Sequence, residues 1–202
     1  MPSAFPLWED SGSPMIELMN IELDISHKRS HGGFRESSTS LSENAQEVSA
    51  MPAYHLIVAQ YDLLRGHKYR NEHWSLVALK NKDEAHIFQL FGNADTFVYL
   101  PSRHPSFQTS ENLCGGCVVG SVEEGKVEWV LEKLREVEVI RYKPGEFDCQ
   151  TWVIQALRLL KDAEEEGVNI LEVSDRKIRE KLMEERERWE LGEDTLEERL
   201  FL

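Results

Sequence analysis

Cys149 is the residue of this sequence best suited to covalent chemistry. It stands at the start of the clearest predicted helix, which runs from Cys149 to about Ala163 with apolar residues every three or four positions. Asp148 is a good N-cap for this helix, and Phe147 and Trp152 occupy the positions of a hydrophobic staple. Unpaired backbone N–H groups and the helix dipole favour a thiolate at such a position, and the same groups can stabilise an oxyanion.

His73 is the candidate general base. A thiol nucleophile needs a base within hydrogen-bond reach and a third group that orients the base. His73 opens a predicted core strand, and a helix that packs its first turn across the start of that strand brings His73 and Cys149 together. The alternative is a structural role for both residues, since a free cysteine is among the most buried residue types.

The third member of the site depends on the register of a hairpin. Two β-rich runs that begin at His73 and His86 flank a polar loop of five residues. A turn centred on Lys82 places Gln89 diagonal to His73 on the same face and turns His86 to the other face. A slip of one residue reverses this assignment. The polar loop favours Gln89, and His86 remains the second candidate.

The remaining pattern predicts an α+β fold in which a small antiparallel sheet packs against the helix that bears the cysteine. Strands are expected over residues 54–61, 73–79, 86–91, 96–100, 117–122 and 137–142, with a loop over 101–112. Helices are expected over residues 127–135, 149–163 and 174–189. The last helix is charged, and it either packs on the domain through Ile178, Leu182 and Trp189 or extends into solvent.

The pair His73-Trp74 at the start of a strand and the block Asp148-Cys149-Gln150 at the start of a later helix resemble the permuted NlpC/P60 proteins. The lecithin:retinol acyltransferase-like branch and a group of fungal proteins are the most similar. The resemblance covers roughly residues 54–165 and implies that Cys149 is the nucleophile and His73 its base. The spacing from His73 to His86 is similar to that of the two histidines in this family.

The sequence departs from the acyltransferase branch at two points. Asp148 stands where that branch usually has an asparagine. A carboxylate beside Cys149 raises the thiol pKa, although an N-cap carboxylate is partly neutralised by the backbone N–H groups that it faces. The sequence also ends in a charged segment in place of the apolar membrane anchor of that branch, which makes a phospholipid substrate less expected.

Cys114 and Cys117 flank two glycines at a spacing that also occurs in metal and redox sites. His104 precedes them, but no second ligand pair accompanies them, and the strand–helix context of a redox motif is missing. We therefore predict a glycine-rich turn that enters a strand, with no metal and no cofactor.

Charge and composition limit the partners and the compartment. The net charge of −14 over 202 residues disfavours binding to nucleic acid. No apolar run is long enough to span a membrane, and the first residues do not resemble a secretory signal. Three cysteines are an odd number and favour a reducing compartment, so we expect a soluble cytoplasmic protein.

Three regions follow from these patterns. Residues 1–52 are rich in serine, glycine, histidine and charge and are predicted to form a mostly flexible arm, in which Met15–Ile25 can add an edge strand. Residues 53–170 are expected to form the domain that resembles the NlpC/P60 proteins. Residues 171–202 form a charged helical extension that can bind a protein partner.

The candidate residues predict a thiol-dependent hydrolase or acyltransferase. Its substrate is an amide or ester whose acyl group, from a small molecule, lipid or peptide, is held on Cys149 as an acyl-enzyme. The competing hypothesis is a catalytically inactive binding module that keeps the fold. Asp148, the polar arm and the acidic C-terminal helix motivate this second hypothesis.

Overall fold

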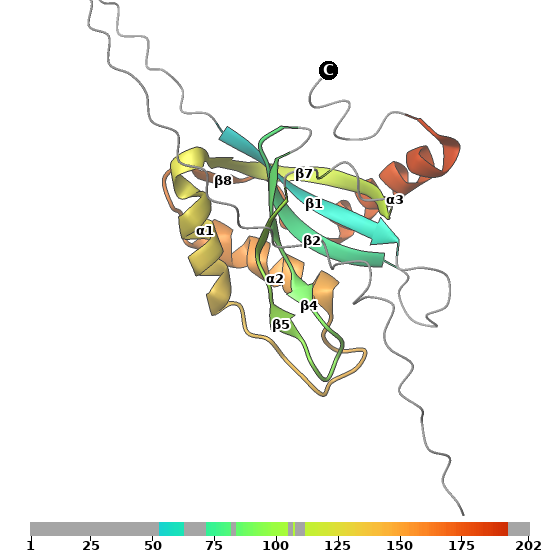
Figure 1. The fold of residues 1–202 in the computed structure, drawn as a ribbon, viewed down its shortest axis with the longest axis horizontal. Coiled ribbons are helices and arrows are strands. Elements are labelled where there is room, and N and C mark those ends of the chain that lie inside the picture. Colours follow the sequence, from blue (N-terminus) through green and yellow to red (C-terminus); the bar gives the residue numbers. More distant parts are fainter. Residues whose placement is uncertain (1–52, 63–71, 82–83, 105–106, 108–111, 194–202) are drawn as a thin grey trace, which may run out of the picture. The chain divides into compact units, whose positions relative to one another are not determined.

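An antiparallel sheet of six strands is the main element of the computed structural model, which describes residues 53–62, 72–81, 84–104, 107 and 112–193. The strand order is β6-β3-β2-β1-β7-β8 (Figure 1). These strands are β1 (Ala53–Asp62), β2 (Glu72–Leu79), β3 (Ala85–Phe88), β6 (Ser102–His104), β7 (Leu113–Glu123) and β8 (Val168–Ile170). A separate pair is formed by β4 (Leu90–Phe91) and β5 (Val98–Tyr99). The predictions for residues 1–52 lie outside the described residues.

The strand β1 has neighbours on both sides and is buried on both faces. Leu56 and Val58 belong to the core on one face, whereas Ile57 and Ala59 belong to a smaller apolar cluster on the other. The nearly continuous apolar run of this strand is therefore explained by burial on both sides. Its neighbour β2 pairs with it up to Asp62 opposite Glu72, the first residue of β2, and places His73 opposite Tyr61.

Three helices pack on the same face of the sheet. They are α1 (Val127–Lys133, continued by a 3₁₀ turn over Leu134–Glu136), α2 (Cys149–Asp162) and α3 (Asp175–Leu191) (Figure 1). Buried side chains of all three helices join the core cluster that contains Leu56 and Val58. The predicted α+β class is confirmed, with the cysteine at the first residue of α2.

The start of α2 is held as the sequence predicts. The Asp148 carboxylate caps the helix, since its Oδ1 accepts from the Thr151 N–H at 2.8 Å and from the Thr151 hydroxyl at 2.9 Å. Phe147 and Trp152 are both buried on either side of this cap. The position of Cys149 is thus fixed by a helix cap and by apolar packing on both sides.

The helix α3 packs against β7 and does not extend into solvent. Ile178 and Leu182 are fully buried as expected, whereas Trp189, the third residue expected to pack, is 38% exposed. A side chain at Gly115 would have its Cβ 2.7 Å from the Cβ of Glu185 on α3. The predicted glycine-rich turn is wrong, because Gly115 and Gly116 lie inside β7, where a missing side chain lets the helix approach.

The predicted strand over residues 137–142 is also wrong. The segment follows an irregular path, with Val137 buried and Val139 and Ile140 packed partly against the core. An irregular segment that packs one side against the core therefore shows the same alternation of apolar residues as a strand. The two edges of the sheet are occupied by β6 and β8.

Several short strands differ from the sequence prediction. The predicted loop over 101–112 contains β6, and β8 was not predicted, because strands of three residues are too short to show a period. The expected strand over 96–100 is reduced to Val98–Tyr99, and the one over 86–91 is interrupted at Gln89. Gly120 allows β8 to approach, since a Cβ there would lie 2.1 Å from the Asn169 carbonyl oxygen.

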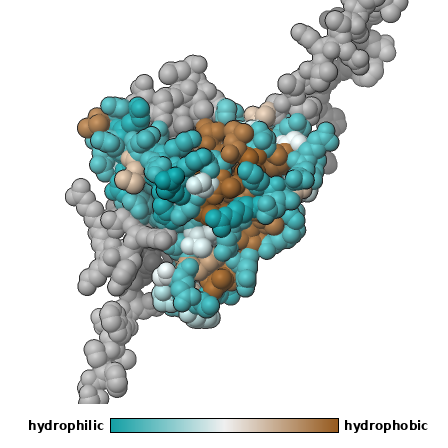
Figure 2. All heavy atoms as spheres, turned by 180° about the vertical axis from the view of Figure 1, so that it is seen from behind, coloured by the Kyte–Doolittle hydropathy of each residue, from teal (hydrophilic) through white to brown (hydrophobic). Residues whose placement is uncertain are grey.

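The surface is largely hydrophilic on the face drawn in Figure 2, where an apolar area crosses the middle. In the described part of the chain, no helix combines the length and the apolar character that crossing a membrane requires.

Candidate active site

The side chain of Cys149 meets His73 at the start of β2. The thiol makes a hydrogen bond with the His73 imidazole and accepts another from the backbone N–H of Trp74. Cys149 is partly exposed, whereas Cys114 and Cys117 are buried. Cys149 is therefore the cysteine that has a base within reach and is not fully buried.

The second nitrogen of His73 is held by Gln89. The Nε2–H group of His73 donates to Oε1 of Gln89 at 3.1 Å. Because Nε2 carries this proton, Nδ1 is the nitrogen left for the Cys149 thiol. In the neutral ring, Nδ1 then has the lone pair that can accept the thiol proton.

Gln89 lies at the break between β3 and β4 and is 3% exposed. The register of β2 and β3 pairs Leu76 with Phe88 and Ala78 with His86, which is the register of a turn centred on Lys82. This register was the condition for Gln89 to share a face with His73. The structure therefore brings together Cys149, His73 and Gln89.

His86 lies away from this group. It stands opposite Ala78, and its ring contacts the Tyr54 ring edge-on with 5.8 Å between the centroids. Burial, together with the positive charge of Arg103, lowers the pKa of His86. The alternative that His86 orients His73 requires the other hairpin register and does not fit this one.

The electrostatics of the pair favour transfer of the proton from sulfur to imidazole. Burial by itself raises the pKa of Cys149, but the charge and hydrogen bond of His73 and the Trp74 N–H outweigh it, so that the pKa of this thiol is lowered. Burial by itself lowers the pKa of His73, but Cys149 and the hydrogen bond to Gln89 raise the pKa above its ordinary value. Both shifts stabilise a thiolate–imidazolium pair.

The Asp148 carboxylate acts against the thiolate, as its negative charge predicts. Its charge raises the pKa of Cys149, but it is the weakest of the influences on that thiol after His73 and Trp74. One carboxylate oxygen is occupied by the Thr151 N–H and hydroxyl groups, as the N-cap position implies. The carboxylate at position 148 therefore reduces the lowering of the Cys149 pKa but does not reverse it.

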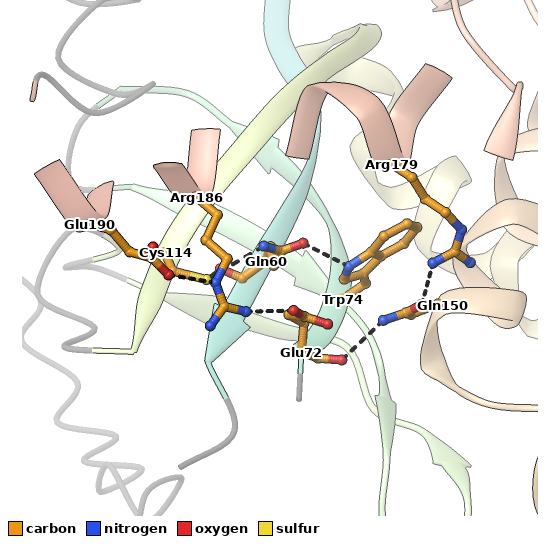
Figure 3. Close-up of polar contacts among 8 residues, drawn as sticks. All are labelled: Gln60, Glu72, Trp74, Cys114, Gln150, Arg179, Arg186 and Glu190. Carbon is orange, nitrogen blue, oxygen red and sulfur yellow. Dashed lines mark hydrogen bonds and ion pairs between the residues drawn. The ribbon is translucent and has the colours of Figure 1, made fainter. Parts of the chain in front are cut away.

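Polar side chains form a network around Trp74 and Gln150, the chain neighbours of the pair, and the sequence did not reveal it (Figure 3). Nε1 of Trp74 donates to Oε1 of Gln60 at 3.1 Å, and Nε2 of Gln60 donates to Sγ of Cys114 at 3.7 Å. A polar residue within the apolar run of β1 was the available signal for Gln60. Arg179 carried no such signal, because it is one of many charged residues on α3.

Cys114 and Cys117 are not arranged as a reactive or metal-binding pair. Burial raises the pKa of Cys114, and burial raises the pKa of Cys117 to about 12. Among the described residues, no three His, Cys, Asp or Glu side chains gather closely enough to hold a metal ion. Both cysteines belong to the interior of β7.

No family model, curated protein or solved structure matches this chain. The assignment of a function therefore rests on the geometry of the site itself.

Proposed function

We propose that this protein is a thiol-dependent hydrolase or acyltransferase that acts on an amide or ester through an acyl-enzyme on Cys149. The observation that carries the proposal is the chain of hydrogen bonds from Cys149 to His73 and from His73 to Gln89. A thiol, a base and a group that orients the base are the three parts that nucleophilic catalysis by cysteine needs.

The order of these parts along the chain supports a permuted NlpC/P60-like domain. His73-Trp74 lies at the start of the strand β2, and a polar residue on the neighbouring segment binds the histidine. Asp148 caps the helix α2, which Cys149 and Gln150 begin and which packs on the same sheet. Gln89 takes the place of the second polar residue of the resembled family. In this proposal residues 53–170 form the catalytic domain.

The proposed reaction begins when His73 accepts the thiol proton and the thiolate attacks the acyl carbon. A carbon–sulfur bond forms while the carbonyl electrons move to oxygen, where the backbone N–H of Cys149, which has no acceptor within its own helix, can donate. Collapse of this intermediate breaks the bond to the alcohol or amine, which takes the proton from His73. Water or an amine, deprotonated by His73, then attacks the thioester, and the thiolate leaves.

Acyl groups from a small molecule, a peptide or a lipid are all compatible with this chemistry. A net charge of −14 makes polyanionic substrates such as nucleic acids unfavourable. The proposed substrate is therefore an amide or ester that is not a nucleic acid.

The test is the rate of Cys149 alkylation by iodoacetamide between about pH 5 and pH 9, which brackets the ordinary thiol pKa of about 8.5. The modified peptide is followed by mass spectrometry in the wild type, in His73→Ala and in the matched control His86→Ala. We expect the wild type and His86→Ala to react fast near neutral pH and His73→Ala to react only at higher pH.

A second measurement asks whether the thiol turns over an acyl group. The protein is mixed with an activated aryl ester, and intact-mass spectrometry detects an acyl adduct that Cys149→Ala lacks. An ordinary thiol profile in the wild type, unchanged by His73→Ala, would overturn the proposal and leave the binding module as the better hypothesis.

A further inference from the structure

The two residues of the proposed catalytic pair are each followed by a side chain that contacts the same arginine. Trp74 follows His73, and Gln150 follows Cys149. The Cζ atom of Arg179 lies 4.7 Å from the centre of the Trp74 ring, and its Nη1 donates to Oε1 of Gln150 at 2.6 Å (Figure 3). One guanidinium group on α3 thus contacts a neighbour of the base and a neighbour of the nucleophile.

Gln150 also binds the residue that precedes His73. Its Nε2 donates to the backbone carbonyl of Glu72 at 3.2 Å. The residues before and after His73 are therefore bound to Gln150 and Arg179 respectively. Gln150 and Trp74 are each 2% exposed, and hydrogen bonds and cation–π contacts are stronger where water is excluded.

Arg179 is itself held by contacts outside the pair. Its Nε lies 2.8 Å from Oδ1 of Asp175, and the adjacent Ile178 is buried in the core. Further along α3, Nη1 of Arg186 lies 2.5 Å from Oε1 of Glu72. The helix is thus attached to the start of β2 at two points, one on each side of His73.

We infer that Arg179 is a positioning residue that holds Cys149 and His73 at hydrogen-bond distance through Gln150 and Trp74, which makes α3 part of the site. This inference rests on the proposed function. A hydrogen bond between a thiol and an imidazole depends on a separation fixed to a fraction of an ångström, and loss of a supporting contact loosens it. Arg179 reaches neither side chain of the pair directly, so its effect passes through the neighbours.

The test compares Arg179→Ala with Arg176→Ala on the same helix. Arg176 is exposed, and its ion-pair contact is with Glu180 at 3.9 Å. The readouts are the midpoint of the pH profile for Cys149 alkylation and the melting temperature. We expect Arg179→Ala to raise the midpoint by about one pH unit, which lowers the rate about tenfold at a pH below both midpoints. Arg176→Ala should match the wild type.

A conservative variant separates positioning from folding. Arg179→Lys keeps the positive charge, but a single ammonium group cannot lie flat on Trp74 and also reach Gln150. We expect its midpoint to lie between those of the wild type and Arg179→Ala. If Arg179→Ala does not fold, Arg179→Lys decides the matter, and an unchanged midpoint in the folded Lys variant overturns the inference.

A double variant tests the route through Gln150. If Arg179 and Gln150 act as one unit, Arg179→Ala with Gln150→Ala shifts the midpoint no further than the larger single shift. Additive shifts would overturn this route. An ordinary thiol profile in the wild type overturns the proposed function and this inference together. A low wild-type midpoint that Arg179→Ala leaves unchanged overturns the inference alone.

Discussion

Nε2 of His73 donates a hydrogen bond to Oε1 of Gln89 at 3.1 Å, although the two residues lie 16 positions apart and on different segments. The bond fixes which nitrogen of the imidazole carries the proton. It also supports the charged ring, because an acceptor bound to the imidazolium raises the pKa of His73.

Replacement of Gln89 tests the value of this bond. Gln89→Ala removes the acceptor, so we expect a lower pKa for His73 and, at a pH below the wild-type midpoint, about a tenfold slower alkylation of Cys149. Gln89→Glu supplies an acceptor of similar length and should retain a fast rate. Equal rates for the wild type and Gln89→Ala would show that Gln89 does not orient the base.

The two effects of Asp148, its negative charge and its capping of α2, can be tested separately. Asparagine is an equally good N-cap, so Asp148→Asn keeps the helix start while it removes the charge that raises the pKa of Cys149. We expect a thiolate that persists to lower pH and a faster alkylation on the acid side of the profile. Asp148→Ala loses the cap as well and should lower the free energy of unfolding by about 1 kcal/mol.

The checks for Asp148 are a pH profile and a urea titration on both variants. A midpoint in Asp148→Asn that equals the wild-type value would mean that the hydrogen bonds from Thr151 already neutralise the carboxylate. Equal stability of the Asn and Ala variants would show that the cap contributes nothing.

The pH dependence of the pair has a definite sign. The pKa of Cys149 is lowered, so the thiolate is lost only when the pH falls through this low value. The pKa of His73 is raised, so the imidazolium is lost when the pH rises through that value. We expect acyl transfer, measured with an activated ester, to follow a bell-shaped profile between these limits. His73→Ala should largely lose acyl transfer, and its thiolate should appear only at higher pH in the alkylation profile.

Gly115 is the position at which the approach of α3 to β7 can be tested. A Cβ at this site meets Glu185, and the residue has φ of +149°, so Gly115→Ala should destabilise the protein by roughly 1–3 kcal/mol. Gly125→Ala is the matched control, because nothing lies within 4 Å of a Cβ there. Thermal unfolding compares the two, and equal melting temperatures would contradict the packing described for α3.

The apolar attachment of α3 can be measured with two neighbouring residues. Leu182 is 1% exposed and Met183 is 71% exposed. We expect Leu182→Ala to cost about 2–5 kcal/mol of unfolding free energy and Met183→Ala to change it by about 0.5 kcal/mol or less. A urea titration distinguishes them. Similar small losses in both variants would mean that α3 is not docked in solution.

The sequence was most informative where local chemistry decides the structure. The cap at Asp148, the apolar stripe of α2 and the polar loop after β2 are local features, and each predicted the observed element. The polar loop favoured the observed hairpin register and with it Gln89, while His86 stayed open as the alternative until the strand pairing was known.

The features missed by sequence reasoning depend on which segments meet in space. The apolar spacing at Val137 is the same for a strand and for an irregular segment packed on one side. The glycines at 115 and 116 predict a turn unless the helix that needs the space is known. Arg179 is one arginine among several on α3, and only its contact with Gln150 sets it apart.

The close approach of α3 to β7 has a consequence for genetics. Gly115 touches neither Cys149 nor His73, yet a side chain there would displace the helix that carries Arg179. Under the proposed function, a variant survey scored by activity would therefore detect Gly115, whereas a survey scored by chemical contact would overlook it. Selection would act on position 115 through the placement of α3.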